Sequence, residues 1–382
     1  PGFDATYPTN APGAHDYFYD IPEGQRPWVA ALDGEGRGLV QTSTARLRGR
    51  KLFVWGMGTG GRRWQEFLAE PGFAYCEIQA GVARTQYEYF PMAAKSDVTW
   101  LEAYGLMEAD PRKVHSTDWG EARAEAEGRL ESLIPAWQMD AEWARTRDLF
   151  ERAPEEIAHR GSGWGALERR RREAAGEPAF CPAALSFTDA SLGEEQAPWL
   201  ALLETGALPE RDPGEAPGAW LVQPEWRRLL EEAVAAGRGD HWLSWLHLGV
   251  MRFQASDSEG ARQAWERSLA LKRSAWALRC LAALAAREKR PEEAADLWLE
   301  AQALAPAVRP LAAETCRALI EAGRPRDVLA LVEGLAPEVR AHGRIRILEA
   351  RAALDAGELD RVEAILLGGI EVPDMREGEV ML

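Results

Sequence analysis

Three runs between residues 75 and 104 of this 382-residue sequence each place polar or aromatic side chains at every second position. Successive side chains point to opposite sides of a strand, so each run would gather its polar and aromatic residues on one face. The residues on these faces are Tyr75, Glu77, Gln79, Arg84, Gln86, Trp100, Glu102 and Tyr104. Aromatic rings stack on the C–H faces of sugars, and carboxylates and amides bind sugar hydroxyls, so this pattern fits a carbohydrate site.

The two carboxylates Glu77 and Glu102 would also suit acid–base chemistry on a sugar. In glycoside hydrolases a separation of about 5 Å between the two carboxyl groups leads to retention, and about 6.5–9.5 Å leads to inversion. We expect Glu77 to be the base or nucleophile and Glu102 the second carboxylate. The surrounding roles are stacking for Tyr75, Trp100 and Trp55, and hydroxyl binding for Gln79, Gln86 and Arg84. The same residues also fit a solvated sheet face with cross-strand pairs and no ligand.

The elements that must position these residues are short strands separated by Gly- and Pro-rich turns, which is typical of a sandwich or barrel. The strand-like runs are Pro27–Asp33, Leu39–Thr44, Lys51–Trp55, Ala74–Gly81, Ala83–Phe90 and Asp97–Met107, and the glycine-rich stretch 56–61 is expected to be a turn. From about Trp119 onward, apolar residues recur three and four apart, which predicts helices. We therefore expect an α+β chain with an antiparallel β-sandwich over 1–118, a helical connector over 119–223 and an all-α repeat superhelix over 224–382.

The strongest pattern is a repeat of 33 to 34 residues that begins near Trp242. Small or β-branched residues recur at one position of the repeat. Large apolar residues lie four positions after it, and small residues lie twelve positions before it. The three sets are Ala261, Ala294, Val328 and Val362; Trp265, Trp298, Val332 and Leu366; and Gly249, Ala282, Cys316 and Ala350. This is the period of tetratricopeptide (TPR) repeats, in which paired helices stack into a solenoid with a concave groove. Docking of a protein or peptide and rigid support of the β region both remain open as its role.

Composition excludes several classes of partner. The net charge is -16 and the pI about 5.0, so the chain would repel nucleic acid. The 4 cysteines do not have the spacing of a zinc site, and no metal or cofactor is expected. Reduced thiols favour a cytoplasmic location. No apolar stretch approaches the ~18 residues of a membrane span, so a membrane association is not expected.

Several stretches resemble a bacterial family of large, mostly uncharacterised proteins. The matching motifs are RGRKLFVWG, GGRRWQEFL, YCEIQAG, ARTQ and WLEAYG before residue 106, with HWLSWLHLGVM and SAWALR in the repeat region. This family joins a β-sandwich related to galactose mutarotase to C-terminal TPR repeats. Its members are normally longer at the N-terminus, so the resemblance implies that this chain, which begins at Pro1, is the C-terminal portion.

The resemblance also implies roles for individual residues. Glu77, in YCEIQAG, matches the general base of mutarotase-like sandwiches. Their histidine acid has no matching residue here, and His15 is expected to lie in an irregular opening segment. We expect a carbohydrate-active protein, resembling a glycoside hydrolase or an aldose epimerase, with a repeat array for docking or support. The alternatives are a non-catalytic carbohydrate-binding protein with an interaction scaffold, and a pure scaffold.

Overall fold

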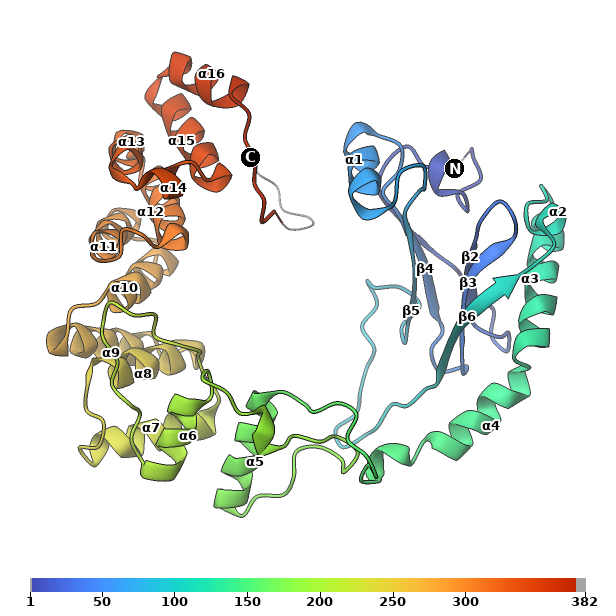
Figure 1. The fold of residues 1–382 in the computed structure, drawn as a ribbon, viewed down its shortest axis with the longest axis horizontal. Helices are drawn as coiled ribbons and strands as arrows, with labels where there is room; N and C mark the ends of the chain where they lie inside the picture. Colours follow the sequence, from blue (N-terminus) through green and yellow to red (C-terminus); the bar gives the residue numbers. More distant parts are fainter. Residues whose placement is uncertain (1, 376–382) are drawn as a thin grey trace. The chain divides into compact units, whose positions relative to one another are not determined.

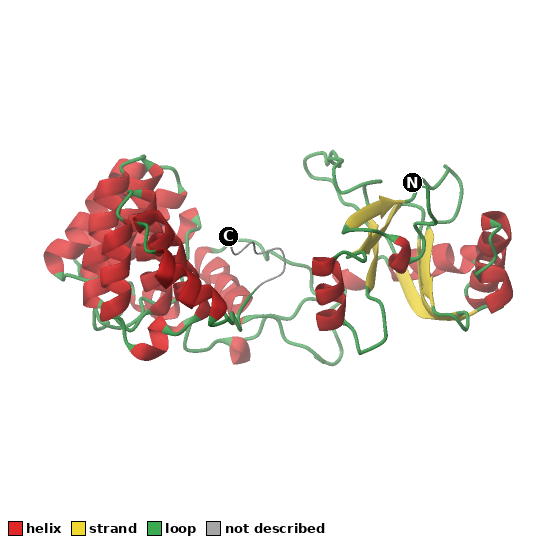
Figure 2. Ribbon diagram, turned by 90° about the horizontal axis from the view of Figure 1, so that it is seen from above, coloured by secondary structure: helices red, strands yellow, loops and turns green. Residues whose placement is uncertain are grey.

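The computed structural model describes residues 2–375 and consists of two compact units (Figure 1). The first unit contains residues 1–155 and 182–184, and the second contains residues 156–181 and 185–382. All strands of the described residues belong to the first unit, whereas the second is helical (Figure 2). The expected combination of antiparallel sheets followed by helical repeats is confirmed. None of the described helices has both the length and the apolar composition to cross a bilayer.

The first unit contains two three-stranded antiparallel sheets. Sheet A has the order β1-β4-β5, with β1 (His15–Phe18), β4 (Gly49–Val54) and β5 (Cys76–Gly81). Sheet B has the order β2-β3-β6, with β2 (Trp28–Leu32), β3 (Arg37–Ser43) and β6 (Glu102–Glu108). The hairpin between β2 and β3 turns at Asp33, whose carboxylate accepts the backbone N–H groups of Glu35 and Arg37 at 2.9 Å each. This side-chain bonding fixes the turn and therefore the register of the hairpin.

Helices cover one face of sheet B and flank sheet A. The first unit contains α1 (Thr59–Leu68), α2 (Pro111–Val114), α3 (Trp119–Leu133), α4 (Ala136–Thr146) and the short 3-10 helices η1 (Pro8–Asn10) and η2 (Leu149–Glu151). Val40 and Met107 of sheet B form a buried cluster with Ala126 and Leu130 of α3. Asp118 begins α3 by accepting the N–H of Gly120 at 2.8 Å, the capping role expected of this residue type. This packing covers one face of sheet B, whereas Leu39, Tyr104 and Leu106 on the opposite face are 46%, 64% and 65% exposed.

Arg50 ties the two sheets together from the buried face of β4. Its side chain is 1% exposed and donates to the carbonyl oxygens of Leu47 at 2.7 Å, Gly49 at 2.8 Å and Pro27 at 3.2 Å. It also donates to Ser43 Oγ at 2.7 Å, which places the guanidinium between β4 and the β2–β3 hairpin. Burial lowers the pKa of Arg50 to about 10. The cation is therefore stabilised by backbone acceptors rather than by water.

The second unit begins with three helices and continues as helix pairs. The first three are α5 (Gly163–Ala175), α6 (Ala197–Thr205) and α7 (Pro224–Ala235), with η3 (Asp189–Ser191) after α5. The pairs are α8 and α9 (Trp242–Gln254, Ser258–Leu271), α10 and α11 (Ala275–Arg287, Pro291–Leu304), α12 and α13 (Arg309–Glu321, Pro325–Gly334), and α15 and α16 (Gly343–Ala356, Leu359–Leu367), with α14 (Pro337–Arg340) before the last pair. The predicted repeat array is thus confirmed. Its small positions are buried, with Ala261, Ala282, Val328 and Cys316 all at 0% exposure.

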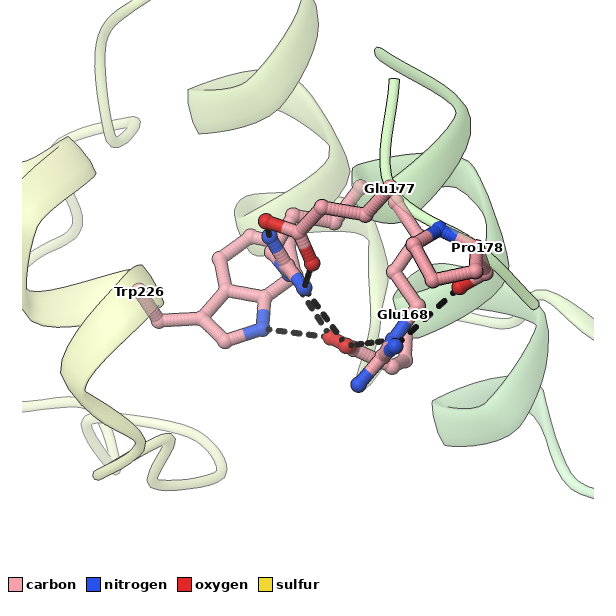
Figure 3. A network of polar contacts seen from close by, with 6 residues as sticks. Glu168, Glu177, Pro178 and Trp226 are labelled. Carbon is pink, nitrogen blue, oxygen red and sulfur yellow. Dashed lines mark hydrogen bonds and ion pairs between the residues drawn. The ribbon is translucent and has the colours of Figure 1, made fainter. Parts of the chain in front are cut away.

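An ion-pair network around the buried Arg171 of α5 contacts α7 through a hydrogen bond from Trp226 (Figure 3). Arg171 is 3% exposed and binds Glu168 at 2.8 Å and Glu177 at 2.6 Å. Glu168 also accepts the indole N–H of Trp226 at 3.4 Å and is bound by Arg172 at 2.8 Å. The basic run 169–172 is therefore largely satisfied by carboxylates of its own unit.

The local predictions were wrong at three places in the first unit. Residues 83–90 form no strand, because Glu88 accepts the N–H of Arg84 and the Thr85 hydroxyl accepts that of Tyr87, which replaces ladder bonds by local ones. The glycine-rich stretch 56–61 includes the start of α1 rather than only a turn. His15 begins β1 instead of lying in an irregular segment, since it pairs with Val54.

Candidate functional site

The outward face of sheet A collects half of the residues expected to bind sugar, namely Trp55, Tyr75, Glu77 and Gln79. Directly opposed residues of antiparallel strands share a face. One row runs Asp16–Phe53–Glu77 across β1, β4 and β5, and the next runs Phe18–Lys51–Gln79. Trp55 and Tyr75 continue the same alternation one residue beyond the ladder. We name this surface the sheet A platform: Asp16, Phe18, Lys51, Phe53, Trp55, Tyr75, Glu77 and Gln79.

Glu77 is held by its two same-face neighbours on the strand. The Tyr75 hydroxyl donates to Glu77 Oε1 at 3.3 Å, and Gln79 Nε2 donates to Oε2 at 2.6 Å. The carboxylate remains partly exposed. It has acceptor capacity beyond these two bonds, because an ionised carboxylate has about four lone-pair sites. This arrangement orients an anion toward solvent and is suited to accepting ligand hydroxyls.

Lys51 links the platform to the loop that follows β5. Its ammonium lies 2.8 Å from Asp16 Oδ1 and 2.8 Å from Gln86 Oε1, and 5.8 Å from the centre of the Phe53 ring. Tyr87 of the same loop lies edge-on to Phe18, with ring centroids 6.0 Å apart. The loop thus reaches the sheet through Gln86, a predicted hydroxyl binder. Arg84 is exposed, and its backbone N–H donates to Glu88 at 3.3 Å.

Aromatic rings continue from the platform onto α1. Phe53 and Trp55 are edge-on with centroids 5.0 Å apart, and Trp55 stacks on Trp64 at 5.1 Å with an interplanar angle of 15°. Trp64 in turn meets Phe67, which is 78% exposed. Sequence reasoning named only Trp55 of this group. The alternation of Lys51, Phe53 and Trp55 would have identified Phe53 and Lys51, whereas Trp64 required knowledge that α1 exists.

Glu102 has a separate network on sheet B. Its carboxylate accepts from Gln41 Nε2 at 2.9 Å, Trp100 Nε1 at 2.8 Å and the Tyr104 hydroxyl at 2.6 Å. Desolvation opposes ionisation, but the hydrogen bonds from Tyr104, Trp100 and Gln41 outweigh it, so the pKa of Glu102 is lowered. An ionised carboxylate that accepts three hydrogen bonds is a poor proton donor. It is suited to holding the three side chains that donate to it. Trp100 and Tyr104 are 40% and 64% exposed.

The structure does not bring Glu77 and Glu102 into one network. Glu77 lies on the outward face of sheet A, opposite to the face that carries Arg50, as the β4–β5 register shows. Glu102 lies on sheet B, close enough to Arg50 for the charge of that guanidinium to help lower the pKa of Glu102. The partners of the two carboxylates have no residue in common. The platform residues and the Glu102 group are therefore two separate surfaces.

A cavity of about 710 Å³ in the first unit includes neither carboxylate. It follows the whole of β2, whose outer edge is unpaired in sheet B, and reaches α3. Its aromatic lining consists of Tyr7, Tyr19, Trp28, Phe73, His115 and Trp119. His115 is fixed there by the carbonyl of Asp33 at 2.8 Å and the hydroxyl of Tyr7 at 2.9 Å. Sequence reasoning did not predict this cavity, because it depends on how α3 packs on the face of sheet B beside β2.

The first helices of the pairs expose a basic surface in a chain of net charge -16. Within α12, positions 310, 314, 317 and 321 are spaced by three and four and share one face. We name the corresponding solvent side of α10, α12 and α15 the first-helix face. Its charged residues are Arg279, Arg287, Arg317, Arg344 and Arg351 against Glu314, Glu321 and Asp355. In contrast, the second helices α9 and α11 expose mainly carboxylates, namely Glu259, Glu266, Glu292, Glu293, Asp296 and Glu300.

The loop between α6 and α7 covers the end of the array at α8 and α10. Indole N–H groups donate to three of its carbonyl oxygens, Trp242 to Arg211 at 3.0 Å, Trp276 to Glu215 at 2.7 Å and Trp199 to Ala219 at 3.2 Å. We name residues 207–221 the strap. The first-helix face of α12 and α15 has no such contact with the strap among the described residues. In residues 2–375, no group of three or more His, Cys, Asp or Glu is placed to hold a metal ion.

The sequence matches no protein-family model and no curated protein. Solved structures resemble it in part. MamA AMB-1, in a C2221 crystal, is 19% identical over 37% of this chain and 84% of that chain, with a TM-score of 0.32. A TPR-domain containing protein from Parabacteroides distasonis is 15% identical over 96% of this chain and 55% of that chain, with a TM-score of 0.49. TPR-like repeats of a Podosopora anserina putative kinesin light chain are 19% identical over 38% of this chain and 83% of that chain, with a TM-score of 0.30. Because all three TM-scores are below 0.5, we identify the repeat array from the helix pairs of this chain and not from these structures.

Proposed function

We propose that this chain is a non-catalytic interaction protein whose repeat array docks an acidic protein segment on the first-helix face. The observation that carries this proposal is a repeated pair of residues. Arg317 and Ile320 of α12 recur 34 residues later as Arg351 and Leu354 of α15. Arg317 is exposed and has no ion pair among the described residues, and Leu354 is 53% exposed. Arg351 differs from Arg317 in that it pairs with Asp355 at 3.4 Å, an exposed ion pair that a partner carboxylate can replace. Two repeated sites with an exposed arginine and an apolar side chain suit a partner with acidic and apolar residues.

The charge distribution supports an acidic partner. The first-helix face carries five arginines against three carboxylates, although the whole chain is strongly acidic. Three of these arginines have a carboxylate partner: Arg279 pairs with Glu314 at 2.6 Å, Arg344 with Asp374 at 3.0 Å and Arg351 with Asp355 at 3.4 Å. Arg287 and Arg317 have no ion pair among the described residues, so they are the cations of this face that are open to a partner. Complementary potentials raise association rates and select among partners. An acidic segment would therefore approach this face and be repelled by the second helices.

The test measures binding of a 12-residue peptide library with acidic and apolar positions, and of the same library with lysine in place of each acid. The variant carries Arg317→Glu with Arg351→Glu, and the control is Arg326→Glu, an exposed arginine on the second helix α13. We expect acidic peptides to bind the wild type and the control and to lose about tenfold or more in affinity for the double variant. Equal binding by all three proteins, or a preference for lysine peptides, would overturn the proposal.

A second candidate function is carbohydrate binding by the sheet A platform. It is favoured by the orientation of Glu77 between the Tyr75 hydroxyl and Gln79 Nε2, next to the Phe53, Trp55 and Trp64 rings. The resemblance to mutarotase-like sandwiches, in which Glu77 matches the base, supports the same ligand class. Because Glu77 and Glu102 do not share a network, we propose binding without turnover in place of glycoside hydrolase or epimerase chemistry.

A glycan array with the wild type, Glu77→Gln and the control Glu35→Gln tests this second function. Glu35 lies in the β2–β3 turn, away from the platform. We expect one class of glycan to bind the wild type and the control, and to bind Glu77→Gln about tenfold more weakly, since a charged acceptor is replaced by a neutral one. Glycan binding that survives Glu77→Gln unchanged would remove the platform as the site. Product formation from a bound glycan would show that the protein is an enzyme.

A further inference from the structure

The segment that follows α16 places a carboxylate on the first-helix face. Asp374 lies 3.2 Å from Arg309 Nη2 and 3.0 Å from Arg344 Nε, and Arg344 Nη2 also donates to the Asp374 carbonyl at 2.9 Å. His342, which caps α15, lies 3.6 Å away. Arg309 begins α12, and Arg344 is the second residue of α15. Two neighbouring first helices thus hold one acidic side chain between their N-terminal ends.

The backbone of the segment approaches α15 too closely for any residue but glycine. A Cβ on Gly343 would lie 2.1 Å from the carbonyl oxygen of Glu371 and 2.7 Å from a Val372 methyl. Gly343 is itself buried. The segment therefore packs on the helix with its backbone as well as with one side chain. The segment turns at Pro373 and Asp374, where the N–H of Met375 donates to the Val372 carbonyl at 3.2 Å. Backbone packing combined with an arginine-held carboxylate is how a short acidic peptide would bind there.

We propose that the ends of α12 and α15 form a binding site for a short acidic peptide, and that residues 371–375 occupy it as an internal ligand in competition with the docked partner. This inference rests on the proposed docking function of the first-helix face. The internal ligand has the chemistry of the expected partner, with Asp374 as its acidic residue and Val372 as its apolar one. Burial opposes ionisation of Asp374, but Arg344 and Arg309 outweigh it and lower its pKa, so the carboxylate is charged when bound.

The spacing of the arginines defines the external ligand further. Arg309 and Arg317 lie eight residues apart on α12, which corresponds to about 12 Å along a helix. Four residues of an extended peptide span about 13 Å. A partner with two acidic residues about four positions apart would therefore reach both arginines, and its first carboxylate would need the place that Asp374 occupies. A tethered competitor acts at an effective concentration in the millimolar range. It therefore lowers the affinity for the partner without preventing the partner from binding.

The test uses a fluorescein-labelled peptide with the sequence of residues 369–375, GIEVPDM, and the full chain. We expect Asp374→Asn to bind this probe about fivefold more tightly than the wild type, because an exposed ion pair of the internal ligand is lost. Arg344→Gln in the Asp374→Asn background should abolish the gain. Asp360→Asn, at an exposed position on α16, is the control and should bind like the wild type. Far-ultraviolet circular dichroism of each variant verifies that the helices are intact.

The outcomes separate this inference from the proposed function. A gain in Asp374→Asn that disappears with Arg344→Gln supports the internal ligand. Equal probe affinity in the wild type and Asp374→Asn, or no probe binding by either, overturns it. In those cases the peptide-library result with Arg317→Glu and Arg351→Glu still decides whether the first-helix face docks an acidic partner. If that variant loses library binding, the proposed docking function stands and only the internal competitor is rejected.

Discussion

Gly249 of α8 lies directly against the indole of Trp265 in α9. A Cβ on Gly249 would lie 2.2 Å from Trp265 Nε1, and the same indole N–H donates to the Leu246 carbonyl at 3.1 Å. The smallest side chain of one helix thus receives the largest of the next. Closely crossing helices require this combination, because a packed interior leaves no space for additional atoms. The pair explains why small and bulky residues recur at the repeat period.

Gly249→Val should destabilise the array. The added methyl groups would displace the Trp265 ring, and overpacking of this kind costs about 1–3 kcal/mol. Urea unfolding followed by tryptophan fluorescence measures the change. Gly334→Ala is the control, because no atom lies within 4 Å of the Cβ it would add. A Gly249→Val protein as stable as the control would show that the helices separate at no cost, contrary to the packing described here.

The repeat array was predictable because one physical rule operates in every pair. The pattern is weakest at its last position, where Leu366 is 55% exposed although its equivalents Trp265 and Val332 are buried. Trp265 contacts the first helix of its own pair and also belongs to a buried cluster with Ala277 and Leu281 of the next pair, whereas no further pair is described after α16. Sequence reasoning could identify the large residue but not whether a neighbour covers it.

The candidate site was predictable strand by strand but not as an assembly. Alternation correctly placed Tyr75, Glu77 and Gln79 on one face, because that rule is local. It could not show that Glu102 belongs to another sheet, since strand order depends on long-range pairing. For the same reason the Asp16–Lys51 ion pair was not predicted, because a hairpin of the other sheet separates β1 from β4 in the sequence.

Glu102 should make the first unit sensitive to acid. Its pKa is lowered in the folded state, so its contribution to stability is present above the ordinary glutamate pKa of about 4.3 and is lost as the pH falls through the lower folded value. Thermal unfolding of the wild type and Glu102→Gln is compared between pH 7 and pH 3. We expect the difference between them to shrink as the pH falls. A difference that is constant with pH would mean that the hydrogen bonds of Glu102 do not depend on its charge.

The four cysteines should differ in their reaction with a thiol reagent. Burial raises the pKa of Cys280 and of Cys316 to about 12, so both are neutral thiols at pH 8, and both are buried. Cys76 and Cys181 are both partly exposed, but burial raises the pKa of Cys76. We expect native protein treated with dithionitrobenzoate at pH 8 to be labelled first at Cys181, as located by peptide mass spectrometry, and Cys280 and Cys316 to react only in denaturant. Early labelling of either buried thiol would indicate that α10 or α12 opens readily.

The strap should depend on the indole N–H groups that hold its backbone. Trp276→Phe keeps an aromatic ring but removes the donor to the Glu215 carbonyl. A carbonyl that has lost its donor is better solvated in water, so the substitution favours release of the strap. Hydrogen exchange measured by mass spectrometry should therefore speed up in residues 207–221 while α11 to α13 remain protected. Trp245→Phe is the matched control, because its indole donates to Asp240 at 2.6 Å and not to the strap. Unchanged exchange in Trp276→Phe would mean that Trp242 and Trp199 suffice to hold the segment, and faster exchange in the control as well would assign the effect to general loosening of the helices.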